Sequence, residues 1–272
     1  MNIESQISFI QNSVDCNRPI SLVRYAHGFW DKVAESNPNL HSQRVDSRKV
    51  AKNFSAYVSK NYKWKPTEFV IYENIEMMKM ELVNLHVAVS AGGSPRDEHK
   101  KNKAIYYKMY KKFGLPEQLF DALIFKKMAL RGGMTKFIKS LRDYNVVFVG
   151  PNYRGLSGGR FGSEQFGRVL GIDNYRHINI HPTEGYSAAK QVYGEICNLK
   201  FENNLPKCFL FSAGATANYW IYKLHNKNIA HLLNIGKAME ILVPNMSPNR
   251  MPYWLRNSKS GYENLQNKLR RM

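Results

Sequence analysis

Residues 208–217 read CFLFSAGATA, an apolar run of four residues followed by a turn of small ones. Four consecutive apolar residues without polar alternation are typical of a strand covered on both faces, as in a parallel sheet. The small residues let the chain turn tightly, and a helix is predicted from there to about residue 225. The stretch therefore predicts a strand–turn–helix unit of an α/β protein.

The same pattern recurs on both sides of this stretch. Three further strands are predicted, at residues 145–149, 175–180 and 230–234. Helices are predicted at residues 164–170 and 184–199. Strands that alternate with helices imply right-handed crossovers and a parallel sheet. The fold class is therefore α/β, with a Rossmann-like, mostly parallel sheet flanked by helices and a core at about residues 144–245.

The first half of the chain is richer in predicted helix. Strands are predicted at residues 20–25 and 68–72. Helices are predicted at residues 47–61, with Ser47 as the N-cap, at 76–87, and at 103–141 with breaks at 114–116 and 132–133.

The division into domains follows from the absence of a linker. No Pro/Ser-rich segment separates the two halves, so one domain over residues 1–272 is favoured. A helical cap domain on a Rossmann-like core is the alternative. Residues 90–95 are predicted to form a mobile loop, and residues 264–272 a basic surface helix.

The charge of the chain is its most unusual bulk property. Forty Lys and Arg against 21 Asp and Glu give a formal net charge of +19. This excess attracts nucleic acid, phosphorylated metabolites or acidic membrane surfaces, and a solvated basic surface explains it equally well. The basic residues are spread along the chain and no recognition motif appears, so nucleic acid is disfavoured as a partner.

Cysteine usage and hydropathy bear on the compartment. Cys16, Cys197 and Cys208 have no CxxC spacing, so neither a zinc site nor a disulfide framework is predicted. No run approaches the roughly 18 apolar residues of a membrane span. The first residues are too polar for a signal peptide, so a cytoplasmic location is expected.

Ligands of open parallel sheets bind outside the carboxyl ends of the strands. The predicted strands place five segments there: residues 24–28, Glu73, and residues 150–154, 212–216 and 234–237.

The segment after residue 211 is the sharpest candidate for a phosphate site. Ser212, Ala213, Gly214 and Thr216 surround the start of a predicted helix, whose free N–H groups and two hydroxyls suit a phosphate. A tight turn that needs small residues only for packing is the alternative. Gly150, Pro151 and Arg154 form a weaker second segment, in which Arg154 is expected to pair with a diphosphate.

Neither of two familiar nucleotide motifs is present. Residues 155–162 lack the Gly-Lys-Ser/Thr of a P-loop and the GxGxxG of dinucleotide enzymes. ATPases and ordinary dinucleotide enzymes are therefore disfavoured.

Four blocks of the sequence together resemble the GT-D-type glycosyltransferases. They are LVRYAHG at 22–28, VFVGP at 147–151, FSAGATA at 211–217 and NIGKAME at 234–240. The family has Arg-Phe/Tyr-Gly-Asp-Gly-Glu, Val-Gly-Pro, Ser-Ala-Gly-Pro-Thr-Ala and Asp-x-Gly-His-x-x-Asp in the same order. The resemblance spans about residues 20–245 and implies a glycosyltransferase with a UDP-sugar donor.

The resemblance carries donor-binding roles onto matching positions. It implies them for Arg24, Gly28, Asn234, Gly236 and Lys237, besides the two segments already described. The metal-binding Asp-x-Glu of the family falls on His27 and Phe29, and a phenyl ring offers no ligand to a hard cation. We therefore expect transfer without a required metal cofactor, with His27 and basic side chains at the leaving diphosphate.

An inverting transfer also needs a general base for the acceptor hydroxyl. Glu73 and Glu184 each follow a predicted strand, and Glu73 is the first choice. Surface carboxylates without a catalytic role are the alternative for both.

The compact, anchor-free chain also resembles the small glycosyltransferases of large algal viruses, which build capsid glycans in the host cytoplasm. That resemblance implies an oligosaccharide or glycoprotein acceptor and a UDP-pentose or UDP-hexose donor, with UDP-xylose the first to test. A basic α/β protein that binds nucleic acid and an inactive glycosyltransferase relative are the competing interpretations.

Overall fold

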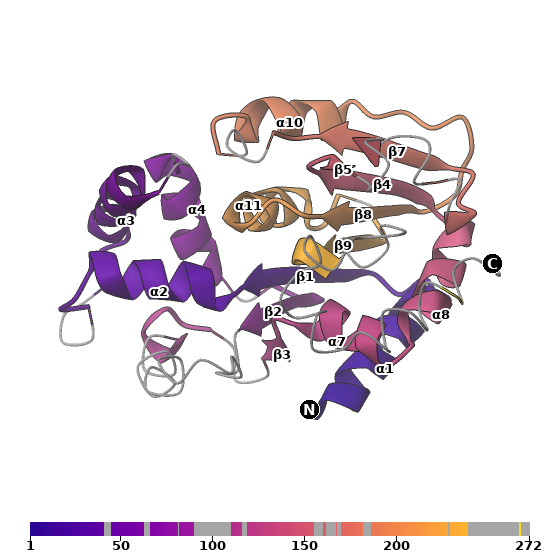
Figure 1. Cartoon of the computed structure of the whole chain (residues 1–272), viewed down its shortest axis with the longest axis horizontal. Helices are drawn as coiled ribbons and strands as arrows, with labels where there is room; N and C mark the ends of the chain where they lie inside the picture. The colour runs from indigo at the N-terminus through magenta and orange to yellow at the C-terminus, as the bar shows by residue number, and fades with distance from the viewer. Residues whose placement is uncertain are drawn as a thin grey trace.

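The structure is a computed structural model of the chain (Figure 1). It describes residues 1–40, 45–62, 66–80, 82–89, 110–115, 119–154, 160–161, 167, 170–181, 186–227, 229–238 and 267.

A seven-stranded sheet, parallel throughout, forms the centre of the described fold and confirms the α/β, Rossmann-like prediction. Its strand order is β3-β2-β1-β9-β8-β4-β7. The strands are β1 (Ile20–Tyr25), β2 (Leu85–Val89), β3 (Phe120–Asp121), β4 (Asn145–Gly150), β7 (Tyr175–Asn179), β8 (Lys207–Phe211) and β9 (His231–Asn234). A separate antiparallel pair joins β5 (Tyr153–Arg154) to β6 (Arg160–Phe161). Strands from both halves of the chain thus share one sheet.

The central strands are apolar because both faces of the sheet are covered. Along β4, Val147 and Val149 belong to one hydrophobic cluster, whereas Val146 and Phe148 belong to the other. Alternate residues of a strand point to opposite faces, so each strand supplies two cores at once. This explains why residues 145–149 lack polar alternation.

Helices form a layer on each face (Figure 1). The first face packs against α4 (Glu68–Met78), α10 (Ala189–Cys197) and α11 (Ala215–Leu224). The second packs against α1 (Ile3–Asp15), α7 (Ile124–Leu130) and α8 (Met134–Ser140). The connections β7–β8 and β8–β9 run toward β3 over the first face, while β3–β4 runs toward β7 over the second. Connections that run in opposite directions on opposite faces of the sheet all have the same handedness, as the crossover rule requires.

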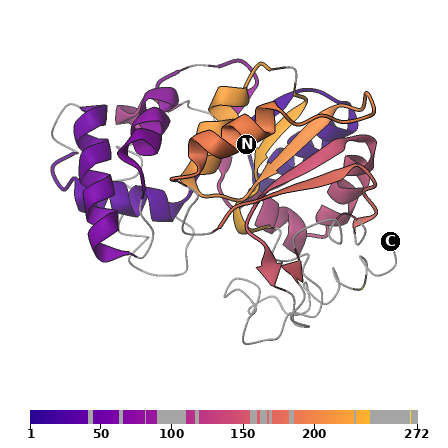
Figure 2. The same cartoon turned by 90° about the horizontal axis from the view of Figure 1, so that it is seen from above.

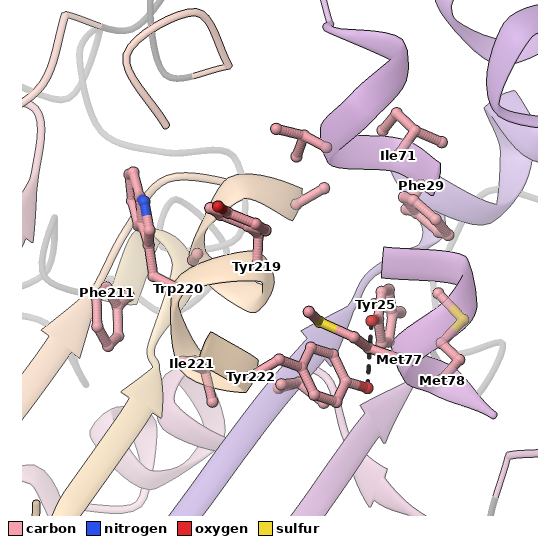
Figure 3. Close-up of a cluster of buried hydrophobic side chains, with 14 of the residues drawn as sticks. Tyr25, Phe29, Ile71, Met77, Met78, Phe211, Tyr219, Trp220, Ile221 and Tyr222 are labelled. Atoms are coloured by element: carbon pink, nitrogen blue, oxygen red, sulfur yellow. Dashed lines mark hydrogen bonds between the residues drawn. The ribbon is translucent and has the colours of Figure 1, made fainter. Parts of the chain in front are cut away.

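Between β1 and β2 the chain forms a helical lobe beside the carboxyl ends of the strands (Figures 1 and 2). The lobe consists of α2 (His27–Ser36), α3 (Ser47–Asn61) and α4. Its aromatic and sulfur-containing side chains pack against α11 and the end of β1 (Figure 3). There the Tyr25 hydroxyl lies 3.2 Å from Asn74 Oδ1 and 3.4 Å from the Tyr222 hydroxyl. Burial raises the pKa of Tyr25, so the cluster contains a neutral phenol.

Several predicted elements are confirmed with small shifts of their ends. The strands at 20–25, 145–149, 208–211 and 230–234 and the helix at 47–61 are present. Asp46, rather than Ser47, is the N-cap of that helix, because its carboxylate accepts hydrogen bonds from the Arg48 and Lys49 N–H groups. The predicted loop at 90–95 lies outside the described residues.

The strand predicted at 68–72 is wrong, because these residues begin α4. The buried positions of α4 recur every three or four residues, and Asn74 Nδ2 donates to the Val70 carbonyl one turn earlier at 2.7 Å. The helix predicted at 76–87 is wrong beyond Met78, since β2 occupies its second part. The two-residue β3 interrupts the predicted helical stretch 103–141, and α1 was not predicted.

None of the described helices is long and apolar enough to cross a membrane.

The amino-terminal edge of the sheet contains a buried histidine. His231 has no exposed surface, and its Nε2 lies 3.0 Å from the Tyr144 hydroxyl. That hydroxyl donates to the Val14 carbonyl at 2.6 Å, so it accepts a hydrogen bond from the Nε2–H of His231. His231 Nδ1 is buried without a partner among the described residues. Burial lowers the pKa of His231 to about 4.

His231 should therefore make the fold sensitive to acid. The unfolded chain gains a proton on this ring near the ordinary pKa of 6.5, but the folded chain only near 4. Stability from the neutral ring is complete above about pH 6.5 and is lost as the pH falls to about 4, by about 3 kcal/mol. In urea titrations, His231→Gln should lose less unfolding free energy than the wild type between pH 7 and pH 4. Parallel pH profiles for the two proteins would contradict this assignment.

Candidate functional site

The carboxyl ends of four adjacent strands carry the four sequence blocks singled out above. In the sheet, β1, β9, β8 and β4 are neighbours in that order. Residues far apart in the sequence, such as Arg24, Asn234, Ser212 and Gly150, are thus brought to one edge. These four segments lie at the carboxyl edge, as predicted, and ligand binding there stays a prediction.

The connections that leave β4 and β8 run in opposite directions across the sheet. From β4 the next strand of the main sheet is β7, on the outer side, whereas from β8 the chain passes through α11 to β9 on the inner side. In open α/β sheets, ligands bind outside the strand ends at such a switch. Gly150 and Ser212 flank this position.

The two strand ends approach each other closely at this switch. The Ser212 N–H donates to the Val149 carbonyl at 2.9 Å. A Cβ on Gly150 would lie 3.0 Å from the Ser212 Cβ and 2.8 Å from the Phe148 ring. A side chain at position 150 would therefore displace the Phe148 ring and crowd Ser212. Ser212 is 8% exposed and Pro151 is partly exposed.

Helix α11 begins at this edge with its N-terminus open. Its N-cap is Gly214, which has φ +59° and makes no side-chain cap hydrogen bond. Apart from its chain neighbours, no atom of the described residues lies within 4 Å of the position where a Cβ would be. Gly214 is exposed and Ala213 is partly exposed, so a ligand can reach the first N–H groups of the helix. Thr216 is completely buried and its hydroxyl has no hydrogen-bond partner among the described residues, so the predicted contact of this hydroxyl with a phosphate stays a prediction.

A network of buried amides, which sequence reasoning missed, holds this edge together. Asn218 Oδ1 accepts from the Arg24 N–H at 2.9 Å, and its Nδ2 donates to the Arg24 carbonyl at 3.0 Å. Asn234 Nδ2 donates to the same Asn218 oxygen at 2.7 Å. Asn234 Oδ1 accepts from the Gly236 N–H at 3.1 Å. Both amide side chains are buried, so Asn234 organises the edge instead of facing a ligand.

Arg24 does not lie beside the α11 N-terminus. Leu22 packs on the second face of the sheet, and Arg24, two residues later, shares that face. Helix α11 covers the first face. Arg24 Nε donates to the Ala122 carbonyl, so its side chain reaches across the end of β2 toward β3. Lys237 is exposed just beyond β9.

The block aligned with the family's metal motif begins α2. His27 and Gly28 are its first two residues, and only their backbone is described. The Phe29 ring lies in the core, with its centroid 5.1 Å from that of Tyr25 and 5.3 Å from that of Trp30. Position 29 is thus a packing position. In the described part of the chain, no three His, Cys, Asp or Glu side chains are grouped as for a metal ion.

The end of β4 is followed by Asn152 and Arg154 and is flanked by His177 of β7. Arg154 lies in β5, but its side chain is outside the described set. The Asn152 N–H donates to Asn179 Oδ1 at 3.1 Å. His177 on β7, which sequence reasoning missed, has its Nε2 2.9 Å from the Gly150 carbonyl and stacks on Phe148. Burial lowers the pKa of His177, so it lies at the edge as a neutral ring.

The two predicted general bases have different outcomes. Glu73 follows no strand. It lies within α4, and its carboxylate is 2.9 Å from Lys223 Nζ of α11. The structural reason for choosing Glu73 was therefore wrong, and its role as a base stays a prediction. Glu184 lies outside the described residues.

The amide network gives a direct test of what positions this edge. Asn218→Leu keeps the side-chain size but leaves the Arg24 N–H and carbonyl without their partners, which should cost about 2–3 kcal/mol of unfolding free energy. The matched control Asn61→Leu, at the exposed end of α3, should change it by less than about 0.5 kcal/mol. Urea titrations of both variants measure the difference, and equal small losses would show that the network is not needed.

Comparison with known proteins adds no relative to this geometry, since no family model, no curated protein and no solved structure matches the chain.

Proposed function

We propose that the chain is a glycosyltransferase that moves a sugar from a UDP-sugar donor to a hydroxyl of a glycan acceptor. The observation that carries the proposal is the convergence of four separate sequence blocks on four adjacent strand ends, beside an open helix N-terminus. The order of these blocks resembles that of GT-D-type glycosyltransferases. The donor diphosphate would bind outside the ends of β4 and β8.

The chemistry of this edge suits a diphosphate. An uncapped helix N-terminus presents free N–H groups and about half a positive charge. Gly214 has no side chain to obstruct it, and Gly150 lets the two strand ends close together. These backbone groups would hold the phosphates while the charge of the leaving UDP develops.

Transfer would proceed without a required metal ion. The metal-binding carboxylates of the resembled family fall here on His27 and on a phenyl ring packed in the core. Hard cations need oxygen ligands, which Phe29 does not offer. Helix N–H groups and basic side chains at the edge, Lys237 among them, would take over the charge stabilisation. Glu73 or Glu184 would serve as general base toward the acceptor.

Charge at Ala213 tests the diphosphate position. A glutamate here would place a carboxylate beside the start of α11, where it repels a phosphate and competes for the same N–H groups. Ala213→Glu should weaken UDP binding about tenfold relative to Ala213→Gln, which has the same size without the charge. Isothermal titration with UDP measures both. Equal affinities would move the diphosphate away from this helix.

A donor screen tests the reaction itself. UDP release is measured with UDP-xylose first and then UDP-hexoses, with an oligosaccharide acceptor, in excess EDTA. We expect one donor to be turned over with EDTA present, because basic and backbone groups replace the metal. Loss of activity in EDTA that manganese restores would contradict the metal-independent mechanism. Absence of turnover with every donor, together with no UDP binding, would contradict the proposed class.

A further inference from the structure

Arg24 occupies the second face of the sheet edge, opposite to α11. Its register partner on β2 is Ala88, whose small side chain packs on that same face. The arginine side chain can therefore extend over β2, and Nε donates to the Ala122 carbonyl, directly after β3. One edge of the guanidinium is thus tied to the backbone.

Gly236 packs against the same guanidinium. This residue has φ +56°, and a Cβ there would lie 2.8 Å from Arg24 Cζ. Any other residue at this position would displace the guanidinium as well as strain the turn. The guanidinium therefore lies between the end of β3 and the turn after β9, and its Nη1 and Cζ atoms approach Gly236 closely.

Among the described residues, no carboxylate is committed to the charge of Arg24. Asp121 lies near enough to favour the cation, but one of its oxygens accepts the Leu123 N–H at 2.7 Å and the other pairs with Lys127. Within the described residues, the guanidinium makes one hydrogen bond, through Nε. Neither of its Nη nitrogens has a hydrogen-bond partner there. Burial lowers the pKa of Arg24 to about 10, because the cation is partly removed from water without full compensation.

We propose that Arg24 forms an oxyanion-binding subsite that takes a carboxylate or phosphate through its two Nη nitrogens. A guanidinium whose Nε is occupied presents its remaining donors as a fork, which matches the two oxygens of either group. Binding supplies the counter-charge that the position lacks. The subsite lies across the sheet from the α11 N-terminus, so it is separate from the diphosphate site and does not depend on a nucleotide. In a glycosyltransferase it would recognise an acidic group on the acceptor or on the donor sugar.

Anion binding to the full chain tests the subsite directly. Thermal unfolding is followed while malonate or inorganic phosphate is titrated against sodium chloride of equal ionic strength. The wild type should show saturable stabilisation beyond that of chloride. Malonate and phosphate represent the two sources of the anion, and the one that saturates at lower concentration identifies the group that the subsite prefers.

Arg24→Lys keeps the charge but removes the fork, so the fitted affinity should fall about tenfold. The matched control is Arg131→Lys, the same change at an exposed arginine paired with Glu4, which should stay within about twofold of the wild type. No saturable effect in the wild type, or unchanged affinity in a folded Arg24→Lys, overturns the subsite.

A second measurement on the wild type covers the case in which Arg24→Lys does not fold. Phenylglyoxal modifies accessible guanidinium groups, and peptide mass spectrometry follows each arginine. Saturating malonate or phosphate should slow modification of Arg24 and leave that of Arg131 unchanged. Equal rates at Arg24 with and without either anion would overturn the subsite. Since Ala213→Glu should weaken UDP and leave malonate binding intact, failure of the subsite and failure of the proposed function give different results.

Discussion

The amide of Asn218 completes the hydrogen bonding of β1 where its neighbour β9 ends. Pairing between these strands stops at Leu22 and Leu233. Along β1 the Ile20 N–H points to the β9 side and the Ser21 N–H to the β2 side, so the Arg24 backbone points to the vacant β9 side. Asn218 offers one acceptor and one donor, as a further strand residue would. This contact fixes α11 against β1, and with it the start of α11 at the β4–β8 switch.

The carboxyl edge of the sheet, which the Asn218 contact holds together, has two chemically different sides. On the first face, backbone N–H groups and glycines leave an open helix start. On the second face, a side-chain cation is held between Ala122 and Gly236. Both positions offer positive charge, but one does so through a helix terminus and the other through a guanidinium. The proposed diphosphate site and the proposed oxyanion subsite thus lie on opposite faces and use different donors.

The parts of the fold that were predictable are those decided by local apolar patterns. Residues 145–149 and 208–211 are buried on both faces, and an uninterrupted apolar run signals this directly. Residues 69–72, FVIY, are equally apolar and rich in strand formers, yet they belong to α4. The partners of α4 are distant in the sequence: its apolar side chains pack in the core, and Asn74 donates to the Ala215 carbonyl of α11 at 3.1 Å. Such tertiary contacts override the local strand preference. The strand wrongly predicted at 68–72 also led to the wrong prediction that Glu73 follows a strand.

The site was predictable as a set of segments but not as a set of side-chain directions. The strand-end rule brings Arg24, Gly150, Gly214 and Gly236 to one edge without further information. The sequence does not show which hydroxyls and amides are buried, and Thr216 and Asn234 both are. The role of Asn218 has no local sequence signal, because its partner Arg24 is 194 positions away. His177 was missed because its contact with Gly150 depends on β4 and β7 being neighbours.

The pairing of β1 with β9 has a consequence for how the chain is made. Among the described strands, this pair joins the first in the sequence to the last, and it lies in the middle of the sheet. During synthesis, β1, β2 and β3 can pair with one another long before β9 leaves the ribosome. Until then β1 keeps an open edge with unpaired backbone N–H and C=O groups. A contact of such high sequence separation forms slowly, so the nascent chain should need protection from aggregation until its last strand closes the sheet.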